Sequence, residues 1–480
     1  MKEKFITNLA FLILVNFLVK PAALLVEAAV QNEVGTQVYG SYTAIFNFST
    51  LFYILLDFGI TSYNNRNIAS NPESLNESLP RLLQIKGLLA IAYLVITFGI
   101  AFILGYSPTQ YYLLAFMAGS QIMLSMLLYL RSNVSGLHFF RVDSLLSVLD
   151  KLLLLILVSC LLWAGWGTFK IQYYAYAQLA SLALAAIAAL FFLVRKTQGL
   201  KFTLAWTEVT TMLRATYPYA LLGVLMTLYY RIDTVMIERM LPIEGDYEAG
   251  AYMASFRFLD AANNVALLFA ALLLPMFARI LAAGEAVQEL LQFSFKLLFT
   301  GAIIVMSVAF FFRYEIVNAI YHESTPYWGE LFGLLFLAFG AVCSVYIYGT
   351  LLTASGNVRV LNLISFGGVL LNIVLNLILI PRMHAVGSAL ATLVTQWAVA
   401  LMHIVAANKA FQLTTNLVLI GKLAFFLLLV VSLGLLIDYS PLSWTINLCG
   451  YSIILMVFAF AIRLFDRKEM VGLLKSQKTV

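Results

Sequence analysis

Residues 423–436 read LAFFLLLVVSLGLL, a run without a charged side chain. Residues 152–162 and 181–194 are uncharged in the same way, and runs of similar composition recur from one end of the chain to the other. A membrane-spanning helix needs about 20 mostly apolar residues. Because the 480 residues are 62% hydrophobic and only 11% charged, this recurrence predicts an all-α polytopic membrane protein.

The apolar runs predict about 14 transmembrane helices. They are continuous rather than alternating, which argues against the strand pattern of a membrane barrel. A helix satisfies its own backbone hydrogen bonds in hydrocarbon, so each span is assigned separately. The predicted spans are 9–31, 41–61, 82–104, 110–130, 146–165, 172–194, 215–237, 250–278, 296–313, 328–352, 360–380, 385–407, 417–437 and 443–463.

The positions of Lys and Arg predict the orientation. Short cytoplasmic loops carry an excess of these residues. With the N-terminus inside, 19 of the 29 fall in inner segments, 4 in outer segments and 6 within or beside spans. We therefore expect both termini in the cytoplasm. The net charge of +6 follows from this topology, and no nucleic-acid partner is expected.

Several other classes of protein are disfavoured. The first apolar run contains Lys20 and Glu27 and lacks a small-residue cleavage site, so we expect no cleavable signal peptide. No loop is long enough for a soluble domain, and no G-x-x-x-x-G-K-[ST] phosphate loop occurs. The three widely separated cysteines predict neither a disulfide framework nor a metal site, and no cofactor is expected.

Two segments of the chain repeat. Residues 35–48, GTQVYGSYTAIFNF, match residues 245–258, GDYEAGAYMASFRF, at six positions with an offset of 210. Two shorter matches, LLQ and SG, recur in the same order at offsets of 208 and 220. Because six helices is an even number, both copies would cross the membrane in the same sense.

The repeat predicts the domain organisation. We expect two parallel six-helix lobes, at 1–200 and 201–410, with the substrate path between them. Residues 411–480 would add two C-terminal transmembrane helices and a cytoplasmic tail.

Four basic residues lie inside predicted spans, namely Lys20, Lys151, Arg231 and Arg257. Three of them, Lys20, Arg231 and Arg257, are the candidates for binding a substrate. A basic residue at the bilayer centre costs at least about 2.5–3.5 kcal/mol, and such residues usually face a bundle interior or a watery cavity. Lys20 and Arg231 also occupy nearly the same position in the two repeats. We therefore expect these three residues to line a cavity and bind an anionic substrate.

Acidic residues accompany them. Glu27, Asp57, Asp233 and Asp260 are candidates for gating or ion coupling, with H+ or Na+ as the candidate ions. Local neutralisation is an alternative for several charges, namely the pairs Asp150–Lys151, Arg231–Asp233 and Arg257–Asp260. Lys86 lies near the end of a span, where a long side chain can extend towards the membrane interface.

Several motifs together resemble one family. Residues 370–381 read LLNIVLNLILIP and are followed by VGSALAT at 386–392. Gly40-Ser41-Tyr42, Asp57-Phe58-Gly59-Ile60 and the stretch RIDTVMI at 231–237 occur in matching order. This pattern resembles the polysaccharide transporter, or Wzx-type oligosaccharide flippase, family of the multidrug/oligosaccharidyl-lipid/polysaccharide exporter superfamily.

The resemblance implies a function. A member would be a flippase, not an enzyme, that moves a polyprenyl-diphosphate-linked oligosaccharide across the bacterial cytoplasmic (inner) membrane by alternating access. Such units serve O-antigen, lipopolysaccharide, capsule or exopolysaccharide synthesis. Arg257 matches a basic cavity residue of related lipid II flippases. The chain departs from the family at Met383-His384, where the family has Tyr-Gly. It departs from the lipid II flippases in its first helix, whose charged residues are only Lys20 and Glu27.

Two other functions remain open at this stage. A drug/cation antiporter of the same superfamily would favour acidic cavity residues, and Glu27 and Asp57 are compatible with it. A membrane polymerase or glycosyltransferase of surface polysaccharide synthesis would need paired acids or a large outer loop. Tyr42, Tyr229, Tyr230 and Tyr252 are candidates for stacking on sugar rings, although most aromatic residues in such chains serve packing.

Overall fold

The computed structural model describes residues 19, 21–61, 64–65, 68, 71–163, 167–197, 206–414 and 416–465. In these residues every regular element is a helix, and 11 helices are long and apolar enough to cross a membrane. The chain divides into two compact units, residues 1–253 and 254–480. The predicted domain boundaries at 201 and 411 stay predictions.

The first unit contains the helices up to α8 and the first residues of α9. Residues 21–34 are helical. The elements that follow are α2 (Thr36–Leu51), η1 (Tyr53–Leu56), η2 (Pro72–Ser74), α4 (Leu75–Ile103), α5 (Pro108–Gly136), α6 (Phe140–Trp163), α7 (Ile171–Val194), α8 (Trp206–Met240) and the start of α9 (Gly245–Ala282).

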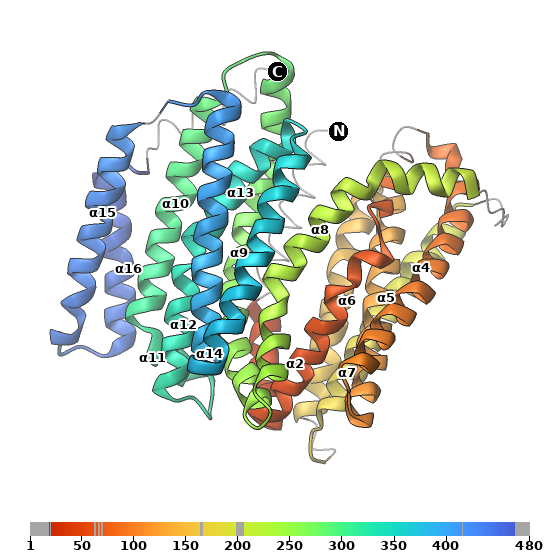
Figure 1. Cartoon of the computed structure of the whole chain (residues 1–480), viewed down its shortest axis with the longest axis horizontal. Helices are drawn as coiled ribbons and strands as arrows, with labels where there is room; N and C mark the ends of the chain where they lie inside the picture. Colours follow the sequence, from red (N-terminus) through yellow and green to blue (C-terminus); the bar gives the residue numbers. More distant parts are fainter. Residues whose placement is uncertain are drawn as a thin grey trace. The chain divides into compact units, whose positions relative to one another are not determined.

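The second unit contains the remainder of α9 and the helices after it. These are α10 (Gln288–Phe311), α11 (Arg313–Ile320), α12 (Pro326–Leu337), α13 (Phe339–Ala354), α14 (Val358–Phe411), α15 (Leu417–Leu435), η3 (Ile437–Tyr439) and α16 (Trp444–Ala461). The helices α15 and α16 lie beside each other and against α10, as Figure 1 shows.

The number of spans agrees with the sequence-based prediction. The predicted spans 360–380 and 385–407 correspond to the two halves of α14. A kink separates the halves at His384, where φ is 54° and ψ is −134°. Residues 21–34 and α2 overlap the first two predicted spans, and residues 9–18 of the first span lie outside the described part of the chain. A left-handed φ is rare for a residue with a side chain, and His384 holds it where the resembled family has glycine.

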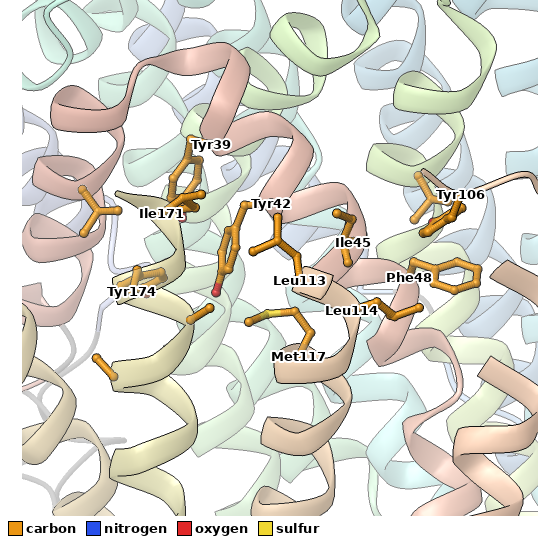
Figure 2. Packing of buried hydrophobic residues seen from close by; sticks show 14 of the residues in the cluster. Tyr39, Tyr42, Ile45, Phe48, Tyr106, Leu113, Leu114, Met117, Ile171 and Tyr174 are labelled. Carbon is orange, nitrogen blue, oxygen red and sulfur yellow. The ribbon is translucent and has the colours of Figure 1, made fainter. Parts of the chain in front are cut away.

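The core of the first unit is built by α2, α5 and α7. Tyr42 of α2 packs 5.8 Å from Tyr39 and 5.4 Å from Tyr174, measured between ring centroids. Figure 2 shows Tyr42 among these rings, with Leu113 and Met117 of α5 on the opposite side. Its hydroxyl donates to Gln178 Oε1 at 2.7 Å. These aromatic side chains therefore hold three helices together.

The second helix is shorter than predicted. The continuous span expected at 41–61 is wrong, because α2 ends at Leu51 and a 3-10 turn, η1, follows it. Phe58 and Gly59 then take positive φ values of 44° and 81°. A right-handed helix cannot pass through such residues, and glycine adopts this conformation without steric cost. The result is a helix broken inside the predicted membrane region.

Candidate functional site

Two glycines bring α2 and α9 together at their N-terminal ends. A Cβ atom on Gly40 would lie 1.7 Å from the carbonyl oxygen of Asp246, and one on Gly250 would lie 2.2 Å from that of Thr36. Residues 246 and 250 stand 210 positions after 36 and 40. The contact is therefore reciprocal, because the glycine of each repeated segment lies against the backbone of the other segment.

Arg231 and Arg257, the two arginines predicted to line a cavity, have different surroundings. Arg231 on α8 is half-buried, with its guanidinium 5.6 Å from the ring centroid of Tyr230. Two residues later Asp233 is buried and accepts a hydrogen bond from the Tyr252 hydroxyl at 2.8 Å. That bond joins α8 to the start of α9 and fixes the orientation of the Asp233 carboxyl group.

Arg257 is 6% exposed on α9. Its Nη1 donates to the Tyr321 hydroxyl at 3.2 Å, and this hydroxyl donates to the Ala254 carbonyl oxygen at 3.2 Å. Tyr321 packs on Trp328, with 5.5 Å between ring centroids. The guanidinium is thus positioned by an aromatic residue that is itself held in place.

The structure does not test whether the candidate residues share one cavity. Lys20 lies outside the described residues, and Arg231 and Arg257 belong to different units. That these three face one cavity stays a prediction. Glu27 is half-buried in the helical segment 21–34, and Asp260 is half-buried one turn after Arg257. Their roles in gating or coupling also stay predictions.

Asp57 and Lys86 form an ion pair that the sequence did not predict. Lys86 is 1% exposed, and its Nζ lies 2.8 Å from Asp57 Oδ1. The expectation that Lys86 extends to the membrane interface is therefore wrong. The reason is the break after α2, which presents oxygen atoms to the ammonium group inside the protein. By contrast, the local pair Asp150–Lys151 is confirmed, at 3.4 Å.

The sequence did not predict a second polar cluster, which joins α5 and α8. Gln110 Nε2 donates to Glu238 Oε1 at 2.9 Å, and Glu238 Oε2 pairs with Arg239 Nε at 2.8 Å. The Arg239 guanidinium lies 3.8 Å from the ring centroid of Tyr106. Burial raises the pKa of Tyr106 to about 12, above the usual value of about 10 for tyrosine. This cluster anchors the end of α8 to the turn between α4 and α5.

The tyrosines proposed for sugar stacking are mostly inside the protein. Tyr42, Tyr229 and Tyr252 are 3%, 4% and 1% exposed. Tyr42 and Tyr252 have hydrogen-bond acceptors within their own unit, Gln178 and Asp233. In this structure the three rings are therefore packing residues and present no face to a sugar.

Comparison with known proteins identifies the family. The profile described as "Polysaccharide biosynthesis protein" matches residues 5–281, which is more than half of the chain. The chain belongs to this family. A search of curated proteins found no match. The match covers residues 5–253 of the first unit and most of α9, including both segments that carry the repeat.

Solved structures define the fold. The lipid II flippase MurJ in an inward closed conformation matches with a TM-score of 0.74 at 15% identity, covering 94% of this chain and 98% of that one. An inward-facing multidrug resistance MATE family transporter of the MOP superfamily matches with a TM-score of 0.67 at 14% identity, covering 82% and 94%. The Vibrio cholerae MATE transporter VcmN in the bent form gives 0.52 at 16%, covering 85% and 98%.

These matches confirm the fold class and the family suspected from the sequence. This member of the polysaccharide biosynthesis family is an all-α multi-pass membrane protein with the fold of a flippase and of MATE transporters. Identities of 12–16% carry the fold and no residue roles.

Proposed function

We propose that this protein is a flippase for a polyprenyl-diphosphate-linked oligosaccharide, working by alternating access in the bacterial cytoplasmic membrane. The observation that carries the proposal is membership of a polysaccharide biosynthesis family combined with a fold shared with a lipid II flippase. The oligosaccharide would be a unit of O-antigen, capsule or exopolysaccharide. The partners are the lipid-linked substrate and the bilayer, with H+ or Na+ as candidate coupling ions.

The physical chemistry of the substrate supports this proposal. A diphosphate carries negative charge that a low-dielectric cavity cannot hold without positive partners. Arginine suits this task because its planar guanidinium binds phosphate oxygens in pairs. Arg257 and Arg231 supply two such groups, and Lys20 would supply a third, more mobile one. No enzymatic step is required of the protein.

Deletion of the gene tests the proposal. We expect the deletion strain to lose most of its surface glycan and to accumulate lipid-linked oligosaccharide on the inner face of the membrane. Surface display can be measured with a glycan-specific lectin or antibody, and a plasmid copy should restore it. Normal display in the deletion strain, with no inner-face accumulation, would contradict the assignment.

The MATE matches favour one alternative. A drug/cation antiporter would also have this fold. The same deletion strain separates the two functions, because an antiporter would alter susceptibility to cationic drugs and leave glycan display unchanged. A polymerase or glycosyltransferase would instead shorten the glycan without trapping its unit on the inner face.

We predict that both termini face the cytoplasm, because Lys and Arg are concentrated in the predicted inner segments. A reporter that is active only outside the cytoplasm should be active when fused after Gly245 and inactive when fused after Val480. A reporter that is active only in the cytoplasm should give the opposite result at both positions. An active external reporter after Val480 would contradict this topology.

A further inference from the structure

The break after α2 surrounds the Lys86 ammonium group with oxygen atoms. Lys86 extends from α4, and its Nζ lies 2.8 Å from Asp57 Oδ1 and 3.0 Å from the Leu56 carbonyl oxygen. Ser125 of α5 adds its hydroxyl at 2.7 Å and its carbonyl oxygen at 3.3 Å. We call these four oxygen atoms the Lys86 cage. They come from two backbone carbonyls, one hydroxyl and one carboxylate.

The local backbone explains why these oxygens are available. In a continuous helix the Leu56 carbonyl oxygen would accept a hydrogen bond from the amide of Ile60. Here that amide donates to the backbone carbonyl oxygen of Asp57 instead. The Leu56 carbonyl therefore accepts from Lys86 and from the Ser125 hydroxyl, the latter at 3.0 Å. Unwound carbonyls of this kind are tolerated at membrane depth only when buried groups satisfy them, and in transporters they commonly coordinate small cations.

Neighbouring groups hold the Asp57 carboxylate in place. The backbone amide of Thr61 donates to Asp57 Oδ1 at 3.3 Å, and the Thr61 hydroxyl donates to the same atom. The Tyr129 ring lies on another side of the ammonium, with its centroid 5.8 Å from Nζ. The groups around the ammonium thus come from the break after α2 and from α5, and do not depend on the lysine alone.

The number of oxygens exceeds what a simple ion pair needs. An ammonium group has three N–H donors, whereas four oxygen atoms lie within 3.3 Å of Nζ. At least one N–H group is therefore shared between two oxygens, so the ammonium is surrounded by oxygen atoms much as a coordinated cation is. Carbonyl, hydroxyl and carboxylate oxygens are the donors that hard cations prefer.

We propose that the Lys86 cage is a monovalent-cation site in which the Lys86 ammonium is the resident cation. Once the lysine is removed, the cage binds a free cation of similar size, such as K+ or NH4+. The tethered ammonium lets the protein hold the helix break without an ion from solution. The site belongs to the first repeat alone, because Leu267 stands 210 residues after Asp57. This inference does not rest on the flippase function.

The test is the thermal stability of the full-length protein in detergent. Lys86→Ala empties the cage and leaves the Asp57 carboxylate in it. We expect its Tm to rise by about 3 °C or more between about 1 mM and about 150 mM KCl or NH4Cl. Choline chloride, whose cation is too large for the cage, should have no such effect at equal ionic strength.

Two matched variants control the result. Lys86→Met fills the space of the lysine with an uncharged side chain, so its Tm should respond equally to all three salts, as should that of the wild-type protein. Adding Asp57→Asn to Lys86→Ala removes the carboxylate and should abolish the response to K+. An equal response of Lys86→Met and Lys86→Ala to K+ would overturn the proposal.

A folding defect would also be informative. Lys86→Ser has a small polar side chain that leaves the cage open, so it provides a second vacated site, and its Tm should also respond to K+. The cytoplasm is rich in K+, so the proposal requires that at least one of these two variants accumulates as folded protein in cells. Failure of both to fold, or an unchanged Tm of both in KCl, would rule out a cation site.

Discussion

Replacing Gly40 by valine should force α2 away from the start of α9 and lower the stability of the protein sharply. The Cβ atom would lie 1.7 Å from the Asp246 carbonyl oxygen and 2.6 Å from the Gly250 amide nitrogen. Both obstacles are backbone atoms, which cannot rotate aside as a side chain can. Overpacking in a core typically costs about 1–3 kcal/mol, occasionally more, and we expect this substitution at or above the upper limit.

The measurement is the Tm of purified Gly40→Val in detergent. Gly99→Ala on α4 is the matched control, because a Cβ there meets nothing within 4 Å. The control should be neutral or stabilising by about 0.5–1 kcal/mol, since glycine is unfavourable inside a helix. Gly250→Val should behave like Gly40→Val, because its Cβ meets the Thr36 carbonyl at 2.2 Å. A wild-type Tm for Gly40→Val would contradict the close contact.

The same glycines show what a sequence can reveal. Gly40 and Gly250 are identical at an offset of 210 because each must let a backbone approach closely, and a repeat preserves such a requirement twice. The long apolar runs likewise predicted the spans, because hydrocarbon imposes the same demand on every helix. Features that depend on the composition of one helix, or on a requirement that both repeats share, could therefore be predicted from the sequence.

Contacts between helices that are distant in the sequence could not be predicted in this way. Asp57 and Lys86 are 29 residues apart, and each alone resembles a charge near the end of a span. Only the break after α2 brings them together, and its one signal was the Phe58-Gly59 pair, since an isolated glycine can end a helix. Gln110 and Glu238, 128 residues apart, gave no signal at all.

The largest functional effect is expected from removing Lys20, Arg231 and Arg257 together. If these residues hold the diphosphate, each lost charge-assisted contact costs about 1.5–3 kcal/mol of binding, and tenfold corresponds to about 1.4 kcal/mol. A single alanine substitution should therefore impair transport by about tenfold to about a hundredfold. The triple variant should abolish it, because all three proposed partners of the diphosphate would then be missing.

The conservative variants sharpen this test. Arg257→Lys should be milder than Arg257→Ala, because it keeps the charge and loses only the paired N–H donors. Arg195→Ala is a suitable control, since Arg195 is an exposed arginine just after α7, with its guanidinium 4.0 Å from the Phe191 ring centroid. It should transport like the wild type.

Surface glycan display, compared at equal protein abundance, measures all of these variants. The triple variant must also show a wild-type Tm, so that lost display reports lost binding and not lost fold. Arg257 needs this check most, because its Nη1 also donates to the Tyr321 hydroxyl at 3.2 Å. A folded triple variant with wild-type display would refute the cationic cavity, since the diphosphate would then cross the membrane without these three charges.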